Sequence, residues 1–529
     1  MERGGNSSYG TFFDDCINYL VSFMKNSLYK KKNNKNSFSI KKGGNVMIFK
    51  AVIFLFATIF TVPELIGQQR GDYFNPLPQR TVETDREALR LMRNGKLDLV
   101  LPGSMRDNDV DMWIHVSRGG DPLTQYFGSF SGYLIFTDLG DRIERAMFGG
   151  SPGAVENIDV EGSWHLRRAF YNYNYNNTDP RQGFTIPEVY DEITDFVAER
   201  DPKRIAVNFS EYLPAADGIS YSSYLKLERI LGPIYSKRIV SAEDVITDFI
   251  VRRTSREVAA QTEVLALARQ LGLQNIYKIV PGVTTIKDTG GRLYYSANTR
   301  PSEHEKDFPP SVRWINGNPD YVLQPGDFFV GSNIGNDELG NYMGFDIDTK
   351  IHCYILREGE TKAPDFIQKV FDKAIAGQWI MAEGMKIGMT AGESMEAMVK
   401  LMEDAGYLYT PFIDSHEYLL DGTRDGDEDY RIVQKALAGK GADVAGFSID
   451  NHAIGNMKEV GPSMGSFRTD HQHLKIQNNN IFAFEYMVHM NIAERRGYPL
   501  CINISNPQII TNKGVEFIQP LNEEIILIK

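Results

Sequence analysis

The sequence predicts a chain of mixed helix and strand that folds into two domains. It has 529 residues, which is enough for two or three domains with real hydrophobic cores. Apolar residues make up 42% and charged residues 24%, as in a globular protein. Strand-like and helical stretches alternate between residues 110 and 210, which indicates an α/β domain with a mostly parallel or mixed sheet.

The elements of this first domain can be placed in order. After a proline-containing connector over 72–85, apolar residues at helical spacing predict a helix over 87–103. A second helix is predicted over 187–201. The expected strands are 110–118, 132–140 and 203–210. A long helical run over 242–272, either one helix or a pair, marks the far edge of the domain.

The first seventy residues have a different character. Residues 25–45 are rich in Lys, Asn and Ser, and 47–69 read MIFKAVIFLFATIFTVPELIGQQ, an apolar run behind a single lysine. We expect 1–46 to be a disordered or mis-annotated leader and 47–69 to be a signal peptide. The alternative is an uncleaved membrane anchor over 47–66. Both interpretations predict a secreted or periplasmic body that meets a membrane only through this segment.

Charge and cysteine content exclude some classes. The net charge of −12 and an isoelectric point near 5.4 argue against a nucleic-acid partner, because phosphate binding requires a basic surface. Three cysteines are too few for a disulfide scaffold. Cys353 and Cys501 could form one bridge, but two buried free thiols are the favoured interpretation.

The C-terminal half contains an ordered set of candidate metal ligands. Asp337 and Asp348 lie 11 residues apart around a strand-like stretch, His452 opens the segment 451–465, and Glu485 lies in the apolar run 480–488. Carboxylates in apolar strands are costly to bury unless a cation or a donor meets them. Together these side chains could hold one or two divalent cations that activate a water molecule.

Several short motifs lie before and around these residues, in a fixed order along the sequence. They are PGVTT (281–285), FPPSVRW (308–314), LQPGDFF (323–329), DTKIHCYILREGETKAP (348–364), His452 followed by Ala-Ile-Gly, and GPSMG (461–465). Their order resembles that of the pita-bread metallopeptidases, the group of Xaa-Pro aminopeptidase, prolidase and creatinase. The resemblance implies a creatinase-like α/β domain over 70–240 and a pita-bread α+β domain over 241–529.

The resemblance also implies an activity. It suggests an exported Xaa-Pro aminopeptidase or prolidase that hydrolyses peptides next to proline through a metal-activated water. The implied metal is Mn, Co or Zn, as one ion, two ions or none, and relatives often form dimers through the N-terminal domain. A creatinase-like hydrolysis of small amidino or guanidino compounds is a third interpretation, because the fold hosts that chemistry too.

The chain departs from the family pattern within the catalytic set. The last bridging glutamate falls near Ser505 or Asn506, and neither side chain can bridge two cations as a carboxylate does. The proton-handling histidine falls on Glu459, which becomes the candidate acid–base residue. These departures support an alternative function, a catalytically inactive homologue that binds peptides or a partner protein.

Further positions bear on this choice. A second histidine of the family pattern falls near Ser448, and His416 is a possible substitute for it. Another alignment places Asn333 at the position otherwise given to Asp337. Asp346 could restore the lost charge or form an outward-facing acidic patch with Asp348, and the patch is favoured. Glu516 is expected on the surface.

Overall fold

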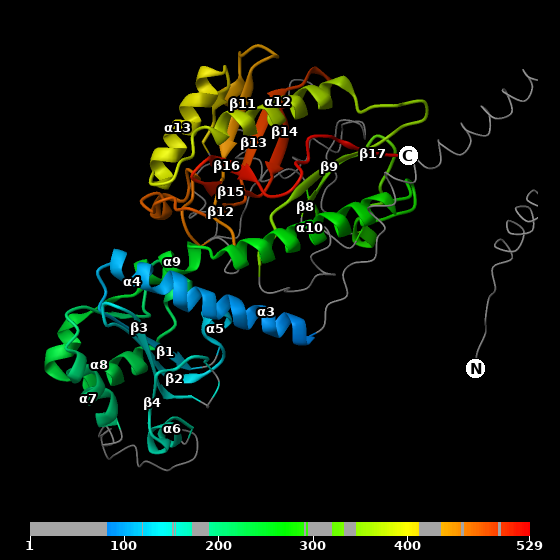
Figure 1. The fold of residues 1–529 in the computed structure, drawn as a ribbon. Helices are drawn as coiled ribbons and strands as arrows, with labels where there is room; N and C mark the ends of the chain where they lie inside the picture. The colour runs from blue at the N-terminus through cyan, green and yellow to red at the C-terminus, as the bar shows by residue number, and fades with distance from the viewer. Residues whose placement is uncertain are drawn as a thin grey trace, which may run out of the picture. The chain divides into compact units, whose positions relative to one another are not determined.

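The structure, a computed structural model, describes residues 82–118, 120–150, 153, 155–171, 190–289, 292–294, 320–332, 345–411, 435–455, 460–495 and 499–529 (Figure 1). The predicted leader 1–46 and the predicted signal or anchor 47–69 lie outside these residues. Among the helices of the described part, none combines the length and apolar character of a membrane span.

The N-terminal part contains a six-stranded mixed sheet, in the order β4-β3-β2-β1-β5-β6. The central β1 pairs antiparallel with β2 and parallel with β5, which confirms the predicted mixed α/β character. The strands are β1 Met112–Arg118, β2 Ser131–Asp138, β3 Ile143–Gly149, β4 Val160–Glu161, β5 Ile205–Val207 and β6 Ile239–Ser241.

Both faces of this sheet are buried, because helices cover it on either side. Along β1, Trp113 enters one core cluster, while its neighbours Met112 and Ile114 enter the cluster on the other face. This is the period of two that an extended strand imposes. The helices of this part are α3 Val82–Gly95, α4 Leu101–Asp107, α5 Thr124–Phe127, α6 Trp164–Tyr171, α7 Asp191–Arg200, α8 Tyr221–Tyr235 and α9 Glu243–Val251.

Two predicted helices are subdivided. The run 87–103 becomes α3, a π-helical turn over Lys96–Val100, and α4, with Pro102 in the first turn of α4. The run 242–272 is a helix pair, α9 followed by α10 Ser255–Tyr277. Thr254 ends the break between them and caps α10, because its side chain accepts from the Glu257 N–H while the Glu257 carboxylate accepts from the Thr254 N–H.

The described residues of the C-terminal part form three further sheets, in the orders β10-β11-β13-β14, β12-β15-β16 and β17-β9-β8-β7. Helices α12 Asp365–Ala382 and α13 Ala391–Asp404 follow one another in the chain, and α12 packs on β13 and β14 (Figure 1). The strands are β7 Arg292–Tyr294, β8 Phe328–Ser332, β9 Lys350–Ile355, β10 Leu408–Tyr409, β11 Ala445–Ile449, β12 Ile481–Phe482, β13 Glu485–Asn491, β14 Pro499–Ser505, β15 Gln508–Thr511, β16 Gly514–Phe517 and β17 Ile526–Ile528.

The core of this part contains many methionines, as a flexible filler of irregular gaps would. Met381, Met398 and Met402 are buried in it beside the strands. Cys353 and Cys501 are both buried and free, which confirms the two-thiol interpretation. Glu516 is exposed on β16, as predicted.

Candidate metal-ligand cluster

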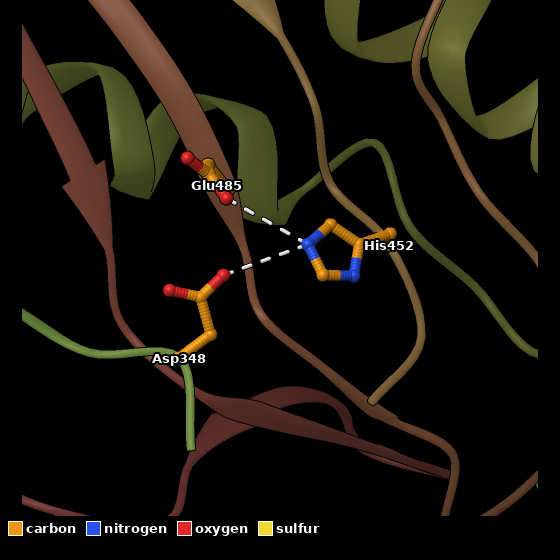
Figure 2. A group of neighbouring side chains, drawn as sticks. All are labelled: Asp348, His452 and Glu485. Carbon is orange, nitrogen blue, oxygen red and sulfur yellow. Dashed lines mark ion pairs between the residues drawn. The ribbon is translucent and has the colours of Figure 1, made fainter. Parts of the chain in front are cut away.

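The structure brings together three of the four predicted metal ligands. Ligand atoms of Asp348, His452 and Glu485 all lie within 4.8 Å of one another. The His452 Nε2 atom lies 3.5 Å from Asp348 Oδ2 and 3.6 Å from Glu485 Oε2, so one imidazole nitrogen faces both carboxylates (Figure 2). These are the donor types that Zn²⁺ or Mn²⁺ takes in proteins.

Strand register explains how three distant segments meet. Strands β11 and β13 run antiparallel, and just beyond β11 the Asp450 N–H donates to the Glu485 carbonyl at 2.9 Å, which brings the following loop with His452 to the start of β13. On the other side Glu485 pairs with Ser505 of β14. The Ser505 hydroxyl lies 2.9 Å from the carbonyl oxygen of Asp348, which ties the segment before β9 to the same point.

Two details of the prediction are wrong. Asp348 was expected inside a strand, but it precedes the first residue of β9, Lys350, by two positions. Glu485 was expected in the middle of a strand, but it is the first residue of β13. Both carboxylates therefore project from strand ends, where side chains of several segments can converge.

Lys350 is the unexpected member of the cluster. Its Nζ lies 3.0 Å from Asp348 Oδ1 and 2.9 Å from Glu485 Oε1, so one ammonium is paired with both carboxylates. The side chain is only 9% exposed. The Asn503 amide donates a further hydrogen bond to Glu485 Oε1 at 2.8 Å. The carboxylates are thus satisfied by side chains of this chain.

The sequence contained a signal for this lysine. Lys350 lies in the run IDTKIHCYI, and a lysine inside such an apolar stretch is rarely buried unless it is paired. Alternate residues of an extended chain share a face, so the partner expected for Lys350 is Asp348.

The charges of the cluster reinforce one another. Burial by itself disfavours the ammonium of Lys350, but Asp348 and Glu485 outweigh it and raise the pKa of Lys350. Burial would likewise raise the pKa of Asp348, but the Lys350 ammonium and then His452 hold that pKa well below its usual range. Burial opposes protonation of His452, yet its two carboxylate neighbours raise its pKa well above the usual value. Each of the three groups therefore favours the charged form of its neighbours.

A second ion pair borders the cluster. Arg468 Nε donates to Asp450 Oδ1 at 3.0 Å. Burial raises the pKa of Asp450 to about 6, although Arg468 and His452 oppose the shift. Three basic side chains, Lys350, His452 and Arg468, thus face three carboxylates in this region.

The other predicted positions fall into two groups. Asp337 and the candidate acid–base residue Glu459 lie outside the described residues, as do His416 and Asn333. Within the described residues, Asp346 is not part of the ligand group; one of its carboxylate oxygens accepts from the Ile347 N–H at 3.0 Å.

The residues at the family's missing positions are committed to hydrogen bonds. The Ser505 hydroxyl lies 2.8 Å from the Ala483 carbonyl oxygen in addition to its contact with Asp348. Asn506 donates to Gln378 Oε1 at 2.9 Å. Ser448 donates to the carbonyl oxygen of Thr410. None of the three contributes a carboxylate or an imidazole to the cluster.

The arrangement as it stands does not fit a divalent cation. A metal at this point would have to share both carboxylates with an ammonium that already pairs with each of them. At separations near 3 Å, repulsion between an ammonium and a dication would be strong in a site with little water. The donor types suit a metal, but the cation that meets them is Lys350.

The chain is similar to several solved structures of known proteins. No protein-family model matches the chain, and no curated protein matches it. The solved structures that it resembles include an X-Pro aminopeptidase from Thermotoga maritima, at 13% identity over 80% of this chain and 100% of that one, with a TM-score of 0.47. An Xaa-Pro dipeptidase from Bacillus anthracis matches at 13% identity over 82% and 100%, with a TM-score of 0.46. A prolidase from Pyrococcus horikoshii matches at 14% identity over 82% and 99%, with a TM-score of 0.44.

These neighbours are proteins of the predicted pita-bread group, and each is matched over nearly its whole length. At such low identity and TM-score, the likeness says nothing of what this chain binds or cleaves.

Proposed function

We propose that this chain is an exported, non-hydrolytic protein of the Xaa-Pro peptidase type that binds peptides instead of cleaving them. The observation that carries the proposal is the pairing of Lys350 with both Asp348 and Glu485, at 3.0 and 2.9 Å. Hydrolysis of this type requires a metal to activate water, and these carboxylates are occupied by an ammonium.

The partner of Glu485 across the sheet supports the same conclusion. Ser505 lies opposite Glu485 in the β13–β14 pairing, near the point where the resemblance expects the bridging glutamate. Its hydroxyl contacts two backbone carbonyl oxygens and offers no charge. A pair of dications would lack the bridging carboxylate that neutralises their repulsion.

Two parts of the proposal come from the sequence. The peptide ligand is inferred from the ordered motifs that resemble the Xaa-Pro peptidases. Export is inferred from the apolar segment 47–69.

The test compares cleavage with binding in the full chain. The protein is equilibrated separately with Mn²⁺, Co²⁺ and Zn²⁺ and assayed with Xaa-Pro dipeptides, with longer peptides that carry proline second, and with small guanidino compounds. Binding of the same peptides, fluorescently labelled, is followed by anisotropy. We expect saturable binding and no turnover above the metal-only blank.

The Glu516→Gln variant, which changes an exposed strand carboxylate, is the matched control for Asp348→Asn. Turnover that Asp348→Asn abolishes and Glu516→Gln retains would establish a peptidase and overturn the proposal. An absence of both turnover and peptide binding would also contradict it.

A further inference from the structure

Lys350 does more than block a site. We infer that its ammonium is the resident cation of the Asp348–His452–Glu485 cluster, so that this protein neither takes up nor needs a divalent metal there. The inference rests on the proposed function and explains how a peptidase-type ligand set can persist in a protein that does not use it for hydrolysis.

The positions of the carboxylate oxygens support Lys350 as the resident cation. A cation bound by the cluster must contact oxygens of both carboxylates, and Lys350 Nζ contacts one oxygen of each. Each carboxylate turns its other oxygen toward His452 Nε2, at 3.5 and 3.6 Å (Figure 2). The two carboxylates are therefore held between an ammonium and an imidazole.

The backbone contacts of Lys350 support the conclusion that a metal does not replace its ammonium. Its backbone carbonyl accepts from the Asn522 amide at 3.0 Å, and its backbone pairs with Ser332 of β8. Asn503 of β14 donates to the same Glu485 oxygen that Lys350 contacts. The ammonium is thus delivered from a strand fixed on both sides, and a metal could displace it only by moving the lysine side chain away from two carboxylates into a largely buried space.

A consequence follows for the ligand set. If Lys350 supplies the positive charge, its removal leaves two carboxylates and an imidazole with a cation-sized gap between them. Three protein ligands of these types suffice for a mononuclear transition-metal site. The site should therefore be metal-free in the natural protein and should bind metal when Lys350 is replaced.

The experiment uses the full chain and four variants. Lys350→Met removes the ammonium, and Lys350→Gln removes the charge but keeps an amide that can donate to both carboxylates. Lys362→Met, at an exposed lysine paired with Asp365, is the matched control. Asp348→Asn combined with Lys350→Gln removes one ligand from the opened site.

Each protein is equilibrated with MnCl₂, CoCl₂ or ZnCl₂ alone, freed of excess metal by gel filtration, and analysed for bound metal. Melting temperatures are measured with metal and with EDTA. We expect no bound metal and no effect of EDTA in the natural chain and in Lys362→Met. Both Lys350 variants should bind about one equivalent, which should raise their melting temperatures. The double variant should lose that equivalent.

Two results would overturn the inference. One is a stoichiometric metal in the natural chain that the Asp348→Asn variant of the turnover assay does not bind. The other is a folded Lys350→Gln variant that binds none of the three metals. If Lys350→Met folds only when metal is present, that dependence supports the inference, whereas failure to fold with every metal, shared by Lys350→Gln, counts against it.

The outcome is distinguishable from that of the proposed function. A natural chain that binds one metal but has no turnover contradicts the inference and leaves the proposed function standing. A natural chain that cleaves peptides without bound metal contradicts the proposed function and leaves the inference about the resident cation standing.

Discussion

Two buried lysines in this protein have pKa values that are shifted in opposite directions. Lys96 lies in the π-helical turn between α3 and α4, with Nζ 3.1 Å from Glu257 Oε1 and 3.2 Å from the Ile250 carbonyl oxygen. Burial lowers the pKa of Lys96 to about 8, although Glu257 opposes the shift. Lys350 is also buried, yet its pKa is raised. The difference lies in the surrounding charges: Lys96 pairs with one carboxylate and the Arg253 guanidinium lowers its pKa further, whereas Lys350 pairs with two carboxylates.

The surroundings of Lys96 show how one buried carboxylate is shared among several partners. Glu257 serves three partners at once: it pairs with Lys96, lies 3.9 Å from Arg253, and accepts from the Thr254 N–H as part of the α10 cap. Its negative charge is therefore shared. Asp348 and Glu485 both act on Lys350, and their combined field exceeds the desolvation penalty. The Lys96 pair joins helices, whereas the Lys350 cluster is a cation site.

Removal of the Lys350 charge should have the largest effect on the free energy of unfolding. Lys350→Met should lower the free energy of unfolding by about 3–5 kcal/mol in EDTA, because it leaves two largely buried carboxylates without their main partner. Urea denaturation measures the change. A loss below about 1 kcal/mol would show that Asp348 and Glu485 do not depend on the lysine.

Lys96→Met should cost less, about 1–2 kcal/mol, because Glu257 keeps Arg253 and the Thr254 N–H as partners. The same urea experiment, run beside Lys350→Met, gives the ranking. Equal losses for the two variants would contradict the claim that they occupy different kinds of site.

The pH dependence of stability should separate the two lysines as well. The pKa of Lys96 in the folded state, about 8, is below the unfolded value of about 10.4, so between these values the unfolded chain binds more protons and stability rises with pH. From pH 7 to pH 9 this contribution should be about 1 kcal/mol. Lys350, with its raised pKa, should contribute no slope in that window, because its stabilisation is lost only above the unfolded pKa.

Urea unfolding of the natural chain and of Lys96→Met at pH 7, 8 and 9 isolates this term. The difference between the two proteins should change by the stated amount over the range. A difference independent of pH would contradict a lowered pKa for Lys96.

The smallest effects come from two helix caps. Thr254 and Thr390 each form a capping box with a glutamate three residues later. Within the part of the chain that the structure describes, Glu257 is the one of these two glutamates that also pairs with a lysine. Each Thr→Ala change should cost about 1 kcal/mol. A double-mutant cycle with Lys96→Met should give a coupling of about 0.5 kcal/mol or more for Thr254 and none for Thr390. Equal couplings would show that Glu257 is not shared.

Much of the architecture could be predicted from the sequence. Periodic apolar residues located the helix pair 242–272, and alternation of strands and helices indicated the mixed sheet around β1. The motifs that resemble the Xaa-Pro peptidases led to Asp348, His452 and Glu485, which the structure brings within 4.8 Å of one another. Asp337 and Glu459 stay predictions. These successes share a physical cause, because hydrophobic period and turn chemistry are local properties of a chain.

Tertiary structure alone decided what the cluster holds. Lys350 could be suspected of pairing with its neighbour Asp348, but nothing local indicates Glu485, 135 residues away. That contact depends on the register that sets Glu485 opposite Ser505 and on the hydroxyl that draws the Asp348 segment to the same strand end. The charge of a buried lysine is set by the carboxylates around it, and those are chosen by strand pairing. The sequence by itself determined which residue types are available, and the fold determined that an ammonium meets both carboxylates.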